Sequence, residues 1–148
     1  MHAEEFETYP ALNPYDDFPF MFQEIPCRSL AALCLALTSP FLELQKAIAA
    51  MDQANLKDHF SNIDLKDQHD LYLQGKTFQK SGHDLDSLME SIFYALGENE
   101  DFKEYLFQSG SACIVHAYDP QDPLQHVLDA DIYAHHLMMV RYHFGFDR

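Results

Sequence analysis

Residues 29–38 read Ser-Leu-Ala-Ala-Leu-Cys-Leu-Ala-Leu-Thr, and every position between Ser29 and Thr38 is apolar. Leucine and alanine favour helical backbone, and Ser29 is a suitable N-cap residue. The helix is expected to open at Arg28 or Ser29 and to end near Thr38, because a proline follows two positions later. The stretch therefore predicts an apolar helix in which Cys34 packs as a small hydrophobic side chain.

Hydrophobic periodicity predicts the other elements. Phenylalanines at positions 18, 20 and 22 alternate with other residues and predict a short strand with one buried face, in which core packing of the rings is favoured over a ligand pocket. Residues 112–117, Ala-Cys-Ile-Val-His-Ala, predict a buried strand because isoleucine and valine are β-branched. Helical spacing predicts helices over residues 41–51, 56–60, 67–73, 98–109 and 131–144.

One longer helix is predicted to begin at Asp84 or Asp86, with Asp86 as its cap, and to stop at Gly97. The helix over residues 41–51 is expected to have an apolar side formed by Leu42, Ala47, Ile48 and Met51. Together these elements predict an α+β fold, a single helix-rich domain with a few short strands.

Length and composition predict one globular domain, because 148 residues with 47% apolar side chains bury a sizeable core. Residues 1–11 are polar and acidic without periodicity, so we expect an N-terminal arm followed by a domain over residues 12–148. No apolar run is long enough to span a bilayer, and the start is acidic where a signal peptide would be basic. These features predict a cytoplasmic protein without membrane contact. The three cysteines, Cys27, Cys34 and Cys113, indicate neither a disulfide framework nor a zinc site.

The charge balance is strongly negative, with 24 acidic against 9 basic side chains and a formal net charge of −15. Such a surface repels phosphate backbones, which excludes direct nucleic-acid binding, and it attracts basic surfaces. Two interpretations stay open: the protein docks on a basic partner, or the acidity only keeps a small protein in solution.

The order Leu12-Asn13, Pro19-Phe20 and Ser29 resembles the start of NADAR-family domains, whose motif runs Leu-Ser-Asn-Phe-Tyr, Pro-Phe, Ser-x-Glu-His and Gln-Ala-x-Lys. Residues 84–122 follow the family's order of Met-x-x-Ala-x-x-x-Lys-Phe, Leu-x-x-x-Leu-Leu-x-Thr-Gly and Ile-Val-Glu. Residues 131–144 are similar to its last helix, with Leu137, Met138 and Arg141 in matching places. The likeness covers most of the chain and implies a NADAR-like α+β fold.

The resemblance also implies that the catalytic centre has been replaced. In the register set by Phe20 and Ser29, alanine, alanine, leucine and threonine at positions 31, 32, 35 and 38 stand where the family has glutamate, histidine, glutamine and lysine. Family members cleave N-glycosidic bonds to ribose, for which a carboxylate activates water and stabilises positive charge. Ala31 does neither. The family's loop with Asp-Trp-Gly corresponds to Asp119 and Asp122, and the chain has no tryptophan.

The candidate ligand-pocket residues are Asn13, Phe20, Ser29, Asp119, Asp122 and Arg141. We predict no metal site, because His135 and His136 point to different faces of a helix and cannot easily join His116, His126 and Asp131. Cys113 and His116 are not predicted to act as nucleophile and base, because a spacing of three on a strand places them on opposite faces. No cofactor is predicted.

The sequence favours a non-catalytic acidic binding protein on a NADAR-like scaffold that docks on a basic protein surface. Small acidic binders of this kind are typical of viral inhibitors of host nucleic-acid-handling or defence machinery, and such a protein would act in the host cytoplasm. One alternative is an N-glycosidase for an ADP-ribosyl or nucleotide-like substrate, with Asp119, Asp122 or Glu24 as its carboxylate. Another is a nucleotide-binding sensor or sponge. The scarcity of arginines, Arg28, Arg141 and Arg148, favours protein binding over both.

Overall fold

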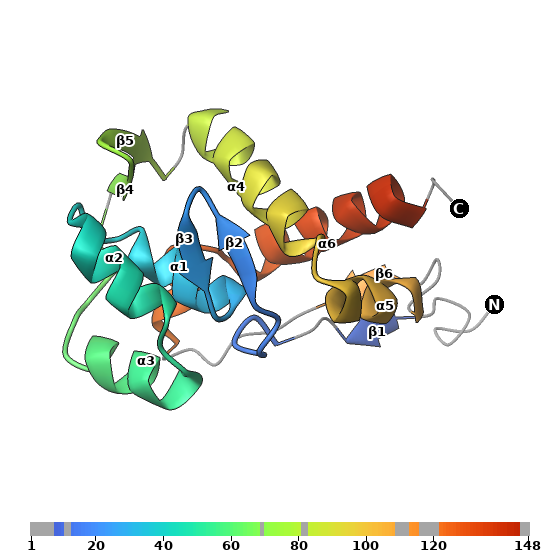
Figure 1. Ribbon diagram of the computed structural model, residues 1–148, viewed down its shortest axis with the longest axis horizontal. Helices are drawn as coiled ribbons and strands as arrows, with labels where there is room; N and C mark the ends of the chain where they lie inside the picture. Colours follow the sequence, from blue (N-terminus) through green and yellow to red (C-terminus); the bar gives the residue numbers. More distant parts are fainter. Residues whose placement is uncertain are drawn as a thin grey trace.

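The computed structural model describes residues 8–10, 13–68, 70–80, 83–108, 113–115 and 122–145 (Figure 1). The described chain forms α-helices, short strands and one 3₁₀ helix around a single core, which confirms the predicted α+β domain. The helices are α1 Leu30–Ala36, α2 Leu42–Ala49, α3 Gln53–Phe60, α4 His83–Leu96, α5 Glu100–Gln108 and α6 Ala130–Gly145, with the 3₁₀ helix η2 at Pro123–His126. The strands are β1 Thr8–Pro10, β2 Phe20–Phe22, β3 Ile25–Cys27, β4 Asp70–Leu73, β5 Lys76–Gln79 and β6 Cys113–Val115.

Helix α1 is buried on every side, as its apolar composition requires. The hydroxyl oxygen of Ser29 accepts the backbone N–H of Ala32 at 3.0 Å, which confirms the predicted N-cap. The Cys34 side chain is fully buried, so its predicted packing is confirmed. Helix α2, strand β3 and η2 pack against α1 (Figure 1). The helix is therefore the centre of the core.

Strands β2 and β3 form an antiparallel hairpin next to α1 and α4. The hairpin buries Phe22 on one side, and Phe20 is half-buried. Phe18 lies before the strand, where its ring meets the edge of Phe102 at 5.8 Å between centroids. The predicted strand is thus confirmed only over its last three residues, because the chain before it turns at Asn13 and Asp16.

A second hairpin, β4–β5, corrects the predicted helix over residues 67–73. Leu71 and Leu73 are buried and alternate with half-buried positions, which is the period of a strand. The N–H of Tyr72 donates to the carbonyl of Leu37 at 2.8 Å and ties the strand to the end of α1. Gly75 has φ +78°, a backbone conformation that a two-residue turn requires.

Helix α2 confirms part of the predicted apolar side of residues 41–51, because Ile48 is buried and Met51 packs half-buried against the core, and it corrects the rest. Its buried face consists of Gln45, Ile48 and Ala49, whereas Leu42 and Ala47 are exposed. The amide of Gln45 is buried because it donates to the carbonyls of Ser39 at 2.8 Å and Tyr72 at 2.7 Å. The buried face of α2 therefore combines a polar link to β4 with the apolar contact of Ile48 and Ala49.

Helices α4, α5 and α6 pack together in the second half of the chain (Figure 1). Helix α4 begins at His83, so Asp86 lies within its first turn and is not its cap. Gly97 follows the helix, and a Cβ atom there would lie 2.3 Å from the ring of Phe144. The predicted stop at this glycine therefore coincides with a close contact between the ends of α4 and α6.

Strand β1 pairs in parallel with β6, which lies within the strand predicted over residues 112–117. Thr8–Pro10 belong to the segment for which the sequence predicts an arm, so three of its residues take part in a sheet. Within the described part of the chain, no helix has the length and apolar character needed to cross a membrane.

Candidate functional site

The site is built where the chain enters α1. The side chain of Asn13 accepts the N–H of Tyr15 at 3.0 Å, and the carbonyl of Pro14 accepts the N–H of Ala31 at 2.9 Å. The turn formed by these residues places Tyr15 against the first turn of α1, with 6% of its surface exposed. Asn13 therefore stabilises the turn that positions Tyr15.

Tyr15 donates its phenolic proton to the carboxylate of Asp122 at 2.5 Å. The same oxygen of Asp122 accepts the N–H of Leu124 at 2.9 Å and caps η2. Burial, and next the hydrogen bond to Asp122, raise the pKa of Tyr15 well above its ordinary value. Tyr15 therefore keeps its proton, and the pair joins two segments that lie 107 positions apart in the sequence.

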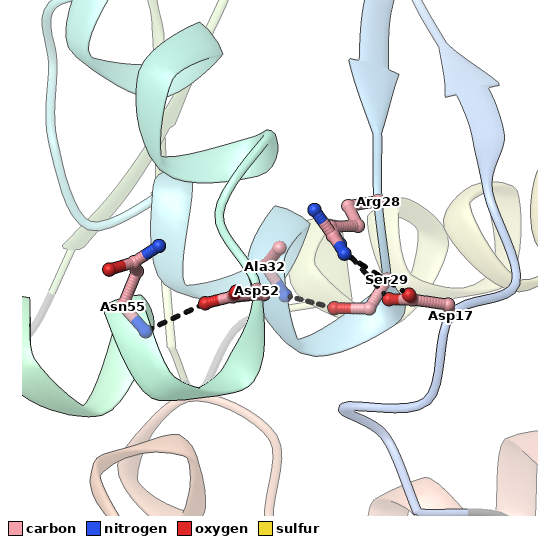
Figure 2. A network of polar contacts seen from close by, with 6 residues as sticks. All are labelled: Asp17, Arg28, Ser29, Ala32, Asp52 and Asn55. Atoms are coloured by element: carbon pink, nitrogen blue, oxygen red, sulfur yellow. Dashed lines mark hydrogen bonds and ion pairs between the residues drawn. The ribbon is translucent and has the colours of Figure 1, made fainter.

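Figure 2 shows the polar contacts at the N-terminal ends of α1 and α3, and Tyr15 lines the same hollow as Asp52, the residue before α3. Asp52 caps α3 by accepting the N–H of Asn55 at 2.9 Å. Alongside it, Arg28 forms a two-point ion pair with Asp17, at 3.1 and 3.3 Å. Asp17 is the main cause of the raised pKa of Arg28, and Asp52 adds a smaller effect in the same direction. The guanidinium of Arg28 is therefore already neutralised by the carboxylate of Asp17.

Two hollows adjoin the Tyr15–Asp122 pair. The first has a volume of about 710 Å³ and lies between the end of α3, the residues after it and η2. Its polar lining comes from Lys57, Ser61, Asn62, Asp64, Asp122, Gln125 and His126. The second, of about 640 Å³, is lined by Tyr15, Asp16, Asp17, Asp52, Gln53, Ala54 and Lys57. Lys57 lines both hollows, so the pair lies between two openings that share one ammonium group.

Lys80 bridges Leu65 and His126, which both line the first hollow. Its ammonium donates to the carbonyl of His126 at 2.6 Å and to that of Leu65 at 3.4 Å. Partial burial lowers the pKa of Lys80. Lys80 therefore links two lining residues of the hollow, whose size falls in the range of small-molecule sites.

The structure places only some of the ligand-pocket residues predicted from the sequence near one another. Ser29 and Asp122 lie at this end of α1, while Asn13 holds the adjoining turn. Phe20 is half-buried on β2 and lines a different groove, and Arg141 is half-buried on α6 without lining either hollow. Asp119 lies outside the described residues. The predicted pocket therefore reduces to Asp122, with Ser29 beside it as a cap.

The position that the resemblance gives to a catalytic glutamate is in the core. Ala31 and Ala32 have no exposed surface, and the hollows are lined by other residues. Glu24 lies at the turn of the β2–β3 hairpin, at the other end of β3 from Ser29. The alternative carboxylates are thus a structural cap, Asp122, and an exposed turn residue, Glu24.

Thiol and metal chemistry find little support in the described residues. Burial raises the pKa of Cys27 and of Cys34 to about 12 each, so neither is a thiolate at neutral pH. The His116 and Cys113 side chains lie outside the described residues. His135 is exposed while His136 is buried against Phe93, and the two imidazole rings lie edge to face at 5.5 Å between centroids. Within that part of the chain, no three metal-ligating side chains gather at one point.

Sequence reasoning missed Tyr15, which holds Asp122, and Lys57, which lines both hollows. The signal for Tyr15 was present, because a tyrosine directly after Asn13-Pro14 stands in a turn next to the apolar helix. Lys57 gave no signal, since a lysine on a polar helix is ordinarily a solvated residue.

The comparisons with known proteins identify a family. The family model described as Bacteriophage protein GP30.3 matches residues 8–142, which is most of the chain. No curated protein and no solved structure gives a significant match. The match extends from β1 to α6 and so includes every element of the site. The chain therefore belongs to the bacteriophage protein GP30.3 family.

Proposed function

We propose that this phage protein is a non-catalytic binding protein that docks through its acidic surface on a basic protein of the bacterial host. The observation that carries the proposal is the excess of unpaired negative charge. The described residues contain two ion pairs, Arg28–Asp17 and Lys103–Glu100. Against these stand exposed carboxylates on several elements, among them Asp58, Asp64, Asp84, Asp86, Glu90, Asp101, Glu104 and Asp131.

The proposed partner is a host protein with a basic surface, including proteins that handle nucleic acid or act in defence. Electrostatic attraction of this kind accelerates association and gives specificity. The host cytoplasm is the place where a phage protein meets such a partner. A NADAR-like scaffold without its catalytic groups fits the proposal, because α1 is apolar and buried where that family carries its glutamate and histidine.

The proposal is tested by capture from a nuclease-treated lysate of the bacterial host on the immobilised protein. We expect basic proteins to be retained at about 50 mM salt and released at about 500 mM, because salt screens charge interactions. A variant with Asp86→Asn, Glu90→Gln, Asp101→Asn and Glu104→Gln should retain much less of them. A control with Ser87→Gln and Ser91→Gln changes exposed neutral positions and should bind as the wild type does. Retention that is insensitive to salt and to the four carboxylate changes would contradict the proposal.

A second candidate function is the binding of a nucleotide-like small molecule, and the first hollow favours it. Its lining combines Lys57 and His126, which suit an anionic group, with carboxylates and amides that suit hydroxyl groups. Cleavage of an N-glycosidic bond there would require a lining carboxylate to act as the base, and Asp122 is the one that the resemblance indicates. Asp122 already accepts hydrogen bonds from Tyr15 and Leu124, so binding without cleavage is the better supported version.

Calorimetric titration with AMP and with ADP-ribose tests this second candidate. We expect Lys57→Met to weaken binding and the exposed control Lys46→Met on α2 to leave it unchanged. Chromatography of the incubated ligand tests cleavage. Release of the base that disappears in Asp122→Asn would establish the glycosidase, and absence of both binding and cleavage would remove the small-molecule functions altogether.

A further inference from the structure

The β2–β3 hairpin carries an apolar side chain on its outer face. Alternation turns Phe22, Ile25 and Cys27 toward the core. Met21 and Pro26 are cross-strand partners on the other face, where a two-stranded sheet ordinarily presents polar residues. Met21 has 59% of its surface exposed. The hairpin therefore offers an apolar face that no described part of the chain covers.

This face is part of a shallow groove of about 660 Å³. Pro19, Phe20 and Met21 line one side, and Pro26, Cys27 and Ala50 the other. The Asp17–Arg28 ion pair lies at the end of the groove nearest α1. The lining is thus mostly apolar, and its one cation within the described residues is paired with a carboxylate.

The other end of the hairpin is acidic. Gln23 and Glu24 have φ of 47° and 70°, so both residues of the turn are in the left-handed region that favours glycine. Glu24 is exposed at this turn. Asp16 and Asp17 are exposed at the opposite end. The hairpin thus has one exposed carboxylate at its turn and two before its first strand, with the apolar groove along it, and this fits a segment in which positive side chains flank an apolar one.

We infer that this groove, defined by residues 19–21, 26–28 and 50, holds a basic segment of the partner protein, with one large apolar side chain against Met21 and Pro26. The inference rests on the proposed function and names the surface that performs it. Charge complementarity selects the occupant: the chain has a net charge of −15, Asp17 lines the groove, and Glu24 is exposed at the turn of the same hairpin. Apolar contact at the centre with charged residues at the rim is the ordinary arrangement of a protein interface.

The test uses three fluorescein-labelled peptides, Lys-Lys-Leu-Lys-Leu-Lys-Lys, its Leu→Ser version and its Lys→Glu version, followed by fluorescence anisotropy. The leucine–lysine peptide should bind at least about tenfold more tightly than the serine version, because each buried leucine adds hydrophobic free energy. The glutamate version should not bind. Met21→Ser and Pro26→Ser should each weaken binding at least about fivefold. Leu42→Ser and Met139→Ser, at exposed apolar positions on α2 and α6, are the matched controls and should bind as the wild type does.

Four outcomes would overturn the inference: no binding of the leucine–lysine peptide, equal binding of the serine version, equal weakening by the control variants, or a wild-type dimer that Met21→Ser dissociates. The last would assign the groove to a second copy of the chain. The lysate capture separates these failures from failure of the proposed function. If capture of basic proteins depends on salt and on the surface carboxylates while Met21→Ser has no effect, the docking function stands and the groove is not its site.

Discussion

At the scale of single residues, the contact that sets the geometry of the site is the Tyr15–Asp122 hydrogen bond. It gives the buried phenol of Tyr15 an acceptor in the half-buried carboxylate of Asp122. A hydrogen bond to a charged group contributes more to stability than a neutral one. The pair therefore holds η2 against the start of α1, and it accounts for the position of Asp122 without any catalytic role.

We predict that Tyr15→Phe lowers the free energy of unfolding by about 2 kcal/mol, because Asp122 loses a charge-assisted donor in a partly buried place. Asp122→Asn should cost a similar amount, and the double variant should cost much less than the sum of the two. Urea unfolding of the four proteins measures this double-mutant cycle. Additive losses would show that the two side chains do not interact.

His136 is the buried residue with the clearest dependence on pH. It stacks on Phe93 at 5.1 Å between ring centroids. Burial, and next the adjacent His135, lower the pKa of His136, although Asp86 and Glu90 act in the opposite direction. A lowered pKa in the folded state means that the unfolded chain binds the proton more strongly. The contribution of His136 to the free energy of unfolding is therefore fully present above the pKa of histidine in the unfolded chain, about 6.5. It is lost as the pH falls below that value.

We accordingly expect the free energy of unfolding to fall between pH 7 and pH 5, and to fall less steeply in His136→Phe. His83→Gln, at an exposed position at the start of α4, is the control and should keep the wild-type slope. Urea unfolding at half-unit steps of pH gives the slopes. Parallel slopes in His136→Phe and the wild type would contradict the assignment.

At the scale of elements, α1 shows how far the sequence alone could be interpreted. Its helix, its Ser29 cap and its burial follow from composition and capping rules, and so do α3, α4, α5 and α6 to within a few residues. The burial of Ile48 on α2 was predicted, but that of Gln45 could not be, because it depends on the carbonyl of Tyr72, which is distant in the sequence. Strand β4 was missed because four residues carry too little periodicity to distinguish a strand from a helix.

The candidate site was less predictable than the fold. Ser29 and Asp122 were identified, but the partner of Asp122 depends on a contact that joins the two ends of the domain. The hairpin turn was hidden for a different reason: Gln23 and Glu24 adopt positive φ without glycine or asparagine, the residues by which such turns are recognised.

The burial of α1 predicts that a carboxylate restored at position 31 destabilises the fold. Ala31→Glu places a charge where the side chain has no exposed surface, so we expect a loss of at least about 3 kcal/mol in the free energy of unfolding. Ala47→Glu, at an exposed position of α2, is the matched control and should change stability by less than about 0.5 kcal/mol. Thermal and urea unfolding measure both. A stable Ala31→Glu protein would show that a cavity can open at this point of α1.

At the scale of the whole molecule, charge repulsion acts against the compact state. The net charge is −15, and the described residues offset little of it through ion pairs. Membership of the phage family and the α+β domain are established on sequence and structure, while the docking function is our proposal from this charge. The charge that would attract a basic partner is the same charge that repels within the free protein.

We therefore predict that the free protein is stabilised by salt. Raising NaCl from about 10 to about 150 mM shortens the Debye length from about 30 to about 8 Å and should raise the free energy of unfolding on the order of 1 kcal/mol. The variant with four neutralised carboxylates should gain less. Urea unfolding at the two salt concentrations gives the difference, and a gain equal to that of the wild type would exclude those carboxylates as the source of the repulsion.

The two buried thiols allow the opening of the core to be measured by chemical labelling. Cys27 and Cys34 lie at the end of β3 and within α1, and each has a pKa of about 12 because of burial. An alkylating reagent reaches them only when the surrounding structure opens. In a Cys113→Ser background, the rate at which each thiol is alkylated therefore reports how often the centre of the domain opens under native conditions. A partner that binds the groove beside Cys27 would slow that thiol first, so a mass spectrometer could localise the complex without any label.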